Sequence, residues 1–231
     1  MKAAVCFEKG RPVRVVEVAL DPPRAGEVLV RIAAAGVCHS DYSVVTGVMP
    51  ARLPCVLGHE GAGVVEEVGA GVEHVRPGDP VLLSWVSQCG QCFYCRAGEP
   101  HLCSVGARIN LHFRMPDGSS RLRHEGVELQ SFSALGAMAE RVVAPARSVV
   151  KLPPDVPLTT AALVGCAVTT GVGAVLNTAA VRPGSSVAVF GVGGVGLNVL
   201  QGAVLAGAER VIAVDVSAAK LELARAFGAT H

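Results

Sequence analysis

The sequence predicts two kinds of domain in one chain, a β-rich domain followed by an α/β domain with a parallel sheet. In the first part, short Val-rich runs are separated by Gly, Pro and Asp, a pattern typical of strands joined by turns, at residues 28–33, 63–68, 81–83 and 139–143. In the second part, the pattern predicts apolar strands at residues 187–190 and 211–214, which alternate with helices at residues 194–206 and 218–227. Uninterrupted apolar strands of this kind belong to a parallel sheet covered on both faces.

A proline-stiffened link, KLPP at residues 151–154, comes just before the change of pattern. We therefore expect a β-rich domain at residues 1–157 and an α/β domain at residues 158–231. A complete doubly wound dinucleotide-binding sheet has about six strands, whereas only two are recognisable before His231. The second domain is accordingly expected to be incomplete.

Composition excludes several classes of partner. The 231 residues are 51% hydrophobic and 17% charged, with a formal net charge of +1. No basic face is evident, so neither nucleic acid nor a membrane surface is an expected partner. The apolar stretch at 158–181 is broken by Thr, Gly and Asn and is interpreted as buried core. No signal peptide is recognisable after Met1, so a cytoplasmic protein is expected.

A glycine-rich turn follows the first strand of the α/β part. Residues 191–196, GVGGVG, match G-x-G-x-x-G between a predicted strand and a predicted helix, a context that makes the motif specific for a dinucleotide. Gly191 permits the turn, Gly193 lets a pyrophosphate approach the backbone, and Gly196 lets helix and strand pack closely. Asp215, 19 residues after Gly196, is placed to hold the ribose hydroxyls, which favours NAD over NADP. The predicted cofactor-binding residues are Gly191, Gly193, Gly194, Val195, Gly196, Asp215 and Lys220, although Lys220 fits a plain surface lysine equally well.

Four of the eight cysteines lie within fifteen residues. Such clustering in a chain without a secretory signal indicates metal binding and not disulfides. The spacing C-x2-C-x2-C-x7-C suits one tetrahedral, closed structural zinc site, with an iron–sulfur cluster as the alternative. Its ligands would be Cys89, Cys92, Cys95 and Cys103.

A second set of zinc-type ligands is scattered along the chain. Cys38 begins the segment Cys-His-Ser-Asp, His59 lies in Gly-His-Glu, and Cys166 lies in Gly-Cys-Ala-Val-Thr-Thr-Gly. Two cysteines and one histidine form an open catalytic zinc site when they meet. Spacing alone does not join them, and each taken singly is more often a buried structural residue.

Along the chain, the order is the Cys38 segment, the His59 segment, the four-cysteine set, the Cys166 segment and the glycine loop. These five motifs in this order resemble the zinc-containing alcohol dehydrogenases of the medium-chain dehydrogenase family, and the resemblance covers essentially the whole chain. It implies an N-terminal GroES-like β domain, and the first part of a Rossmann domain in which the sequence ends. It also implies a catalytic and a structural zinc, NAD, an alcohol or aldehyde substrate, and a homo-oligomer for the full-length protein.

The resemblance also implies roles for individual residues. Cys38, His59 and Cys166 would ligate the catalytic zinc, with Glu60 as a nearby carboxylate. Asp41 would orient His59, Ser40 would take the alcohol proton, and His39 would face the cofactor pyrophosphate unless it is a solvent-exposed loop histidine. Ser43 stands where many members carry the histidine that ends the proton relay, and a serine is no base near neutral pH. We therefore expect water to complete the relay.

The substrate is predicted less closely. Trp85 and Phe132 are expected to line an aromatic slot for primary alcohols with flat or extended apolar tails, although Trp85 also fits core packing. In the branch that oxidises the formaldehyde–glutathione adduct, an acidic residue and an arginine hold the tripeptide. Here the loop at residues 47–50, GVMP, lacks the acid and Ala107 replaces the arginine, with Arg108 adjacent. A thiol–formaldehyde adduct is thus the alternative substrate.

Two rival classes are distinguishable by their metal content. A zinc-free quinone reductase of the same superfamily lacks both cysteine sets, and a non-enzymatic zinc-binding product would keep only the four-cysteine site. Neither accounts for a complete catalytic ligand set together with a full glycine loop.

Overall fold

The computed structural model describes residues 1–231, which form two compact units, Met1–Gly165 and Cys166–His231. The sequence suggested a domain change after residue 157, whereas the helical turns α4 (Leu158–Ala161) and η4 (Ala162–Gly165) lie in the first unit. There Ala161 and Ala162 pack against Ala62 in a small apolar cluster. These turns cover part of the first unit's main sheet, which accounts for their assignment to it.

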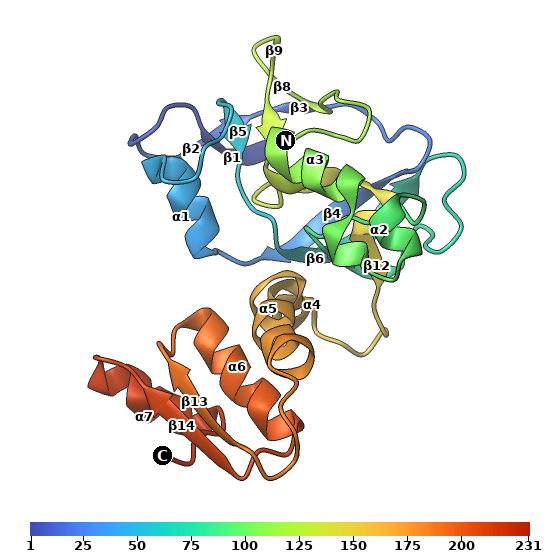
Figure 1. Ribbon diagram of the computed structural model, residues 1–231. Coiled ribbons are helices and arrows are strands. Elements are labelled where there is room, and N and C mark those ends of the chain that lie inside the picture. The colour runs from blue at the N-terminus through green and yellow to red at the C-terminus, as the bar shows by residue number, and fades with distance from the viewer. The chain divides into compact units, whose positions relative to one another are not determined.

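The main sheet of the first unit has five strands in the order β11-β4-β6-β7-β12, and all its neighbouring strands are antiparallel (Figure 1). Its strands are β4 (Glu27–Ala35), β6 (Gly61–Val68), β7 (Pro80–Leu83), β11 (Arg141–Pro145) and β12 (Val149–Lys151). The four Val-rich runs therefore form strands as predicted, and they build one side of the core. Val28, Val30, Val65, Val81 and Leu83 are almost completely buried in this core.

Two smaller sheets complete the β structure of the first unit. The four-stranded sheet runs β10-β5-β1-β2 and consists of β1 (Lys2–Cys6), β2 (Arg14–Glu17), β5 (Cys55–Val56) and β10 (Gln130–Ser131). The three-stranded sheet runs β3-β8-β9 and consists of β3 (Ala19–Leu20), β8 (Leu122–His124) and β9 (Val127–Glu128). Strand β10 comes after the long segment that follows the cysteine cluster. It pairs with β5, which pairs with β1, so this segment returns to strands from the beginning of the chain.

Three α-helices of the first unit carry candidate site residues or support them. They are α1 (His39–Thr46), α2 (Phe93–Arg96) and α3 (Ser104–His112). Short 3-10 turns lie at η1 (Pro100–Leu102), η2 (Phe132–Ala134) and η3 (Ala146–Ser148). Helix α1 ends at Gly47, whose φ of +75° is the left-handed conformation that favours glycine at a helix C-terminus.

The second unit contains a parallel two-stranded sheet, β13 (Ser186–Phe190) and β14 (Arg210–Val214), with helix α6 (Gly194–Leu205) between them in sequence. It also contains α5 (Ala167–Gly173), the π-helical turn η5 (Ala174–Thr178) and α7 (Ala218–Ala226). Both predicted strands and both predicted helices are confirmed (Figure 1). Helix α5 approaches α6 closely at Gly171, where a Cβ atom would lie 2.6 Å from Asn198 Cβ.

No single helix is long and apolar enough to cross a membrane, and one bent pair, residues 158–165 with 167–178, passes such a test by length and composition only.

Candidate functional site

The first candidate metal ligand, Cys38, lies at the beginning of helix α1. It is the N-cap residue, and its backbone N–H donates to Asp41 Oδ2 at 3.0 Å. The chain reaches it from β4 through Gly36, where a Cβ atom would lie 2.6 Å from Glu60 Cδ. A larger residue at this position would displace the Glu60 side chain from its place.

Asp41 connects this helix to the segment that carries His59. Its side chain is buried, and Oδ1 accepts a hydrogen bond of 2.9 Å from the Gly58 backbone N–H. The same oxygen lies 3.4 Å from His59 Nδ1. A histidine whose Nδ1–H faces a carboxylate is held in one tautomer and offers Nε2 to a metal.

The Cys38 sulfur, a His59 ring nitrogen and a Glu60 carboxylate oxygen lie within 4.8 Å of one another. These three donor types are the ones that zinc takes in proteins. Burial raises the pKa of the Cys38 thiol, but hydrogen bonding at Ser40 and the nearby His59 outweigh this effect, so that the pKa lies below its ordinary value. A thiol that ionises readily is a better metal ligand.

Cys166, the third predicted ligand of this site, begins the second unit. It is the N-cap residue of α5, and its carbonyl oxygen accepts a hydrogen bond of 2.9 Å from the Thr170 N–H. The beginning of a helix therefore fixes its backbone. Its membership of the catalytic ligand set stays a prediction.

The aromatic side chain of Phe132 supports His59 from one side. The two rings are 4.7 Å apart between centroids, and Phe132 is only 5% exposed. The next two residues, Ser133 and Ala134, have φ values of +54° and +55°, which cost energy in residues other than glycine. Non-glycine strain of this kind is frequent at functional sites. Phe132 is therefore a packing partner of His59, and its predicted role in the substrate slot is not tested by this contact.

The other residues of the Cys-His-Ser-Asp segment differ in exposure. Ser40 Oγ lies 3.6 Å from Cys38 Sγ, which donates to it, and is half-buried. His39 is exposed, with its ring 5.5 Å from that of Tyr42. Ser43 is half-buried within α1, and its carbonyl accepts the Met49 N–H at 2.9 Å. Ser40 therefore places its hydroxyl against one of the candidate ligands.

The four-cysteine set forms a second cluster, in which the sulfur atoms lie within 4.8 Å of one another. Helix α2 begins after Cys92, and α3 begins after Cys103. Backbone N–H groups point at the sulfurs, among them those of Cys92 to Cys89 Sγ at 3.3 Å and of Cys89 to Cys103 Sγ at 3.2 Å. A fold that presents several donors to sulfur is suited to thiolates bound to a metal.

The environments of these four thiols are unequal. Backbone hydrogen bonding at Cys95 and Ser104 lowers the pKa of Cys92 to about 6. Burial raises the pKa of the Cys103 thiol, but backbone hydrogen bonds at Gly106 and Cys89 outweigh this effect, and the net shift of the pKa is downward. Burial raises the pKa of Cys95 to about 11. A metal would replace this competition with direct bonds to all four sulfurs.

The glycine loop has the geometry that its motif predicts. Gly191 follows β13 with a φ of +87°, a conformation that favours glycine. Gly193 is the N-cap of α6, and a Cβ atom there would meet nothing within 4 Å, so this side of the backbone is open to a ligand. At Gly196 a Cβ atom would lie 2.0 Å from the Gly191 carbonyl oxygen, so no larger residue fits.

Asp215 lies beside this loop and is part of its structure. Its carboxylate accepts the backbone N–H groups of Val192 at 2.9 Å and of Ser217 at 3.0 Å. The Ser217 and Val192 hydrogen bonds are the largest causes that lower the pKa of Asp215. Lys220 Nζ is 3.8 Å from the same carboxylate. The negative charge expected beside the ribose is thus held at the loop by backbone donors.

Trp85 packs against the apolar core of the five-stranded sheet, and its carbonyl oxygen accepts a hydrogen bond of 3.4 Å from Asn110 Nδ2. This position agrees with the packing alternative, and its place in a substrate slot stays a prediction.

The structure adds three supporting residues that the motifs did not single out. Gly36 leaves room for Glu60, Gly58 links Asp41 to His59, and Phe113 lies with its ring 4.6 Å from that of Phe132. The glycines adjoin the motifs and were recognisable as candidate close approaches. Phe113 carries no such signal, because its partner is 19 positions away in sequence.

Comparison with known proteins places these sites in a family. Residues 24–154 match the alcohol dehydrogenase GroES-like domain, and residues 194–231 match the zinc-binding dehydrogenase model. A putative alcohol dehydrogenase D from Mycobacterium tuberculosis is 49% identical over 99% of this chain and 62% of its own length. An S-(hydroxymethyl)glutathione dehydrogenase from Synechocystis is 47% identical over the same shares of the two chains.

Solved structures agree with these relatives. A benzyl alcohol dehydrogenase from Acinetobacter calcoaceticus has a TM-score of 0.93 and 37% identity, over 100% of this chain and 62% of that one. The chain thus spans about 62% of the length of the relatives that it matches. With a GroES-like β domain, two thiol-containing ligand clusters and a glycine loop of the dinucleotide-binding type, it belongs to the zinc-binding alcohol dehydrogenase family.

Proposed function

We propose that the full-length protein is a zinc-dependent oxidoreductase that transfers a hydride between a primary alcohol and NAD, and so interconverts alcohol and aldehyde. The observation that carries this proposal is the convergence of Cys38, His59 and Glu60, with Asp41 holding His59 in place. Relatives named alcohol dehydrogenases match nearly the whole chain and support it.

Two zinc ions per chain fit the two ligand clusters. The catalytic ion would be held by Cys38, His59 and Cys166, with Glu60 close enough to exchange with a ligand. The structural ion would be held by the four-cysteine cluster. Zinc bound in an open site would act as a Lewis acid and lower the pKa of a bound alcohol, so that the alcohol could lose its proton near neutral pH.

The chain's own residues would position the reactants and move the proton. Ser40 is the hydroxyl beside the ligand cluster, and we assign it the hydrogen bond to the alcohol oxygen. Asp41 keeps the ring of His59 oriented through Nδ1, an arrangement that also raises the basicity of the other ring nitrogen. Because Ser43 is not a base near neutral pH, the proton leaves to water at the end of the relay.

NAD would lie with its pyrophosphate on the open backbone at Gly193 and on the N-terminus of α6. His39 is the proposed second contact to the pyrophosphate. The Asp215 carboxylate would accept the ribose hydroxyls and repel a 2′-phosphate, which selects NAD over NADP. Gly194 and Val195 supply N–H groups in the first turn, and Lys220 lies beside the ribose position.

For the substrate, we propose a primary alcohol with an aromatic or extended apolar tail. The similarity to a benzyl alcohol dehydrogenase supports this choice, and the family resemblance implies that Trp85 and Phe132 line the slot. A homo-oligomeric, cytoplasmic enzyme is the corresponding expectation for the full-length protein.

A thiol–formaldehyde adduct is the second candidate substrate. The relative from Synechocystis is named S-(hydroxymethyl)glutathione dehydrogenase, and the same zinc and NAD chemistry would serve both reactions. The loop at residues 47–50 without an acidic side chain, and Ala107 in place of an arginine, weigh against glutathione itself.

The test is NADH formation by the full-length protein with a panel of primary alcohols and thiol–formaldehyde adducts, with metal analysis on the same sample. We expect two zinc ions per chain and turnover that Cys38→Ala or His59→Ala abolishes. Cys6→Ala is the matched control, because Cys6 is a buried cysteine outside both ligand clusters.

Each rival predicts a different result. A quinone reductase would contain no zinc, and a non-enzymatic zinc-binding protein would keep one ion and reduce no NAD. Two ions without turnover of any alcohol or adduct would contradict the proposed activity while leaving both metal sites in place.

A further inference from the structure

A pocket of about 210 Å³ in the first unit is lined by an excess of basic side chains. Arginines at three positions and one histidine form part of its lining, and no Asp or Glu lines it. The complete lining is Arg52, Arg108, His112, Arg114, Met115, Pro116 and Gly118.

Helix α3 and its C-terminal turn present two of these side chains together. Arg108 and His112 are four residues apart and therefore share a face of the helix. The helix ends at Phe113, which adopts a left-handed conformation with a φ of +54°. This conformation costs about 1–2 kcal/mol in a residue other than glycine, and burial of the Phe113 side chain offsets the cost. The turn brings Arg114 to the same pocket.

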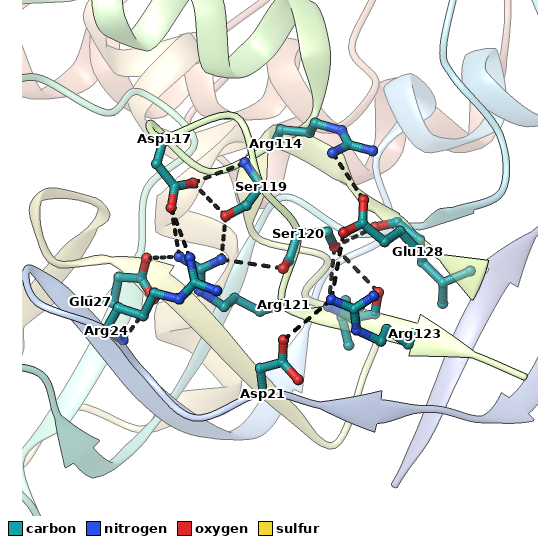
Figure 2. Close-up of polar contacts among 12 residues, drawn as sticks. Asp21, Arg24, Glu27, Arg114, Asp117, Ser119, Ser120, Arg121, Arg123 and Glu128 are labelled. Atoms are coloured by element: carbon teal, nitrogen blue, oxygen red, sulfur yellow. Dashed lines mark hydrogen bonds and ion pairs between the residues drawn. The ribbon is translucent and has the colours of Figure 1, made fainter. Parts of the chain in front are cut away.

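Arg114 is held on one edge of its guanidinium group (Figure 2). Its Nε donates to Gln130 at 2.9 Å, and its Nη1 donates to Glu128 at 3.1 Å and to the Gly118 carbonyl at 3.0 Å. Glu128 is shared with Arg123, at 3.6 Å. Nη2 takes part in none of these bonds and is left as a donor for a ligand.

The wall of the pocket at Pro116 and Gly118 is held in place by ion pairs of the residue between them. Asp117 lies between the lining residues Pro116 and Gly118, and its carboxylate pairs with Arg121 at 3.1 Å and with Arg24 at 3.3 Å (Figure 2). Arg121 is in turn buried against Glu27. This network holds the wall in one position without a ligand, so that little ordering is needed on binding.

We propose that this basic pocket binds the carboxylate or phosphate group of an anionic ligand. Guanidinium groups match the geometry of both anions through paired N–H donors. Arg52 is exposed and forms no ion pair within the structure, and Arg108 donates only to the Pro116 carbonyl oxygen, at 3.3 Å. Since Glu128 offsets one of the three arginines at most, the pocket keeps a net positive charge.

The position of the pocket beside the candidate catalytic site suggests two sources of the anion. Phe113 lies between the lining residues His112 and Arg114, and its ring contacts Phe132, which contacts His59; the successive centroid distances are 4.6 and 4.7 Å. The bound group is therefore either a free anion or the charged tail of the alcohol. The second source rests on the proposed function.

The binding test uses inorganic phosphate and the full-length, zinc-loaded protein, in calorimetric titrations at constant ionic strength. We expect the double variant Arg52→Ala/Arg108→Ala to bind phosphate about tenfold more weakly or worse, the size expected for lost charge-assisted hydrogen bonds. The double variant Arg11→Ala/Arg182→Ala removes the same two charges from exposed positions outside the pocket and should leave binding unchanged. Absence of phosphate binding, or an equal loss in this control variant, would overturn the proposal.

A kinetic arm separates the two sources. The KM of an alcohol with a terminal carboxylate is compared with that of a neutral alcohol of equal length. If the double variant raises only the first KM, by about tenfold, the anion is part of the substrate. If the ratio of the two KM values is unchanged while phosphate binding is lost, the pocket is assigned to a free anion. Phosphate binding without turnover of any alcohol would reject the proposed function and retain the pocket.

Discussion

Removal of Arg121 is expected to be among the most damaging single changes outside the metal clusters. Its Nε and Nη2 donate to the two carboxylate oxygens of Glu27 at 2.9 and 2.5 Å, and the side chains are only 2% and 8% exposed. Glu27 also accepts the Arg24 backbone N–H at 2.9 Å. A pair in this position joins β4 to a segment 94 residues later in the chain.

Arg121→Met leaves the Glu27 carboxylate buried beside an apolar side chain. Breaking a buried ion pair in this way costs about 3–5 kcal/mol, which corresponds to a fall in Tm of roughly 6–20 °C for a domain of 150–250 residues. The double variant Glu27→Leu/Arg121→Met removes both charges. It should recover most of the loss, because a well-packed apolar pair is often as stable as a buried ion pair.

The assay is thermal and urea unfolding of the zinc-loaded protein, with zinc content measured on each variant. Arg141→Met serves as the control, because Arg141 forms an ion pair of 2.7 Å with Glu66 but is 44% exposed. Exposed pairs contribute about 0–1 kcal/mol. A loss below about 1 kcal/mol in Arg121→Met, or a double variant no more stable than the single one, would refute this reasoning.

Three further predictions concern the sites and pH. Asp41→Asn should weaken catalytic zinc about 10- to 100-fold by loosening His59, measured by competition with a chelator; unchanged affinity would contradict the geometry at Nδ1. Gly196→Ala places a Cβ atom 2.0 Å from the Gly191 carbonyl and should abolish NAD binding in fluorescence titration while the zinc content stays at two per chain. Although burial raises the pKa of Asp117, hydrogen bonds from Ser119 outweigh it and hold this pKa at about 2, so its stabilising contribution is complete above its ordinary range and is lost as pH falls through about 2. Asp117→Asn should flatten this part of the acid unfolding curve, and an unchanged curve would count against the network.

Features that depend on neighbouring residues were predictable from the sequence. The glycine loop needs Gly191 because of its φ of +87° and Gly196 because a Cβ atom would collide with the Gly191 carbonyl five positions earlier, and the four-cysteine cluster is confined to one loop. Short Val-rich runs separated by Gly, Pro and Asp likewise predicted four strands of the main sheet, because β-branched residues favour strands and these turn residues end them.

Long-range packing was not predictable from residue patterns alone. Spacing did not join Cys38 to His59; family resemblance proposed the pairing, and the fold brings their ligand atoms together in the first unit. No residue pattern predicted the ring contacts of Phe132 with His59 and Phe113, and its place in a substrate slot stays a prediction. No sequence pattern singled out Arg121, which is buried against Glu27.

The sequence by itself thus determined the Val-rich strands, the strands and helices around the glycine loop, and the four-cysteine cluster, because turns, helix beginnings and short loops are governed by local backbone conformation. Only the tertiary structure decided which distant side chains meet: the Asp41 contact with His59, the strained turn after Phe132 and the basic pocket at Arg52, Arg108 and Arg114. The physical reason is that burial and long-range contacts depend on how complete elements pack, and that packing sets the environment of each charge.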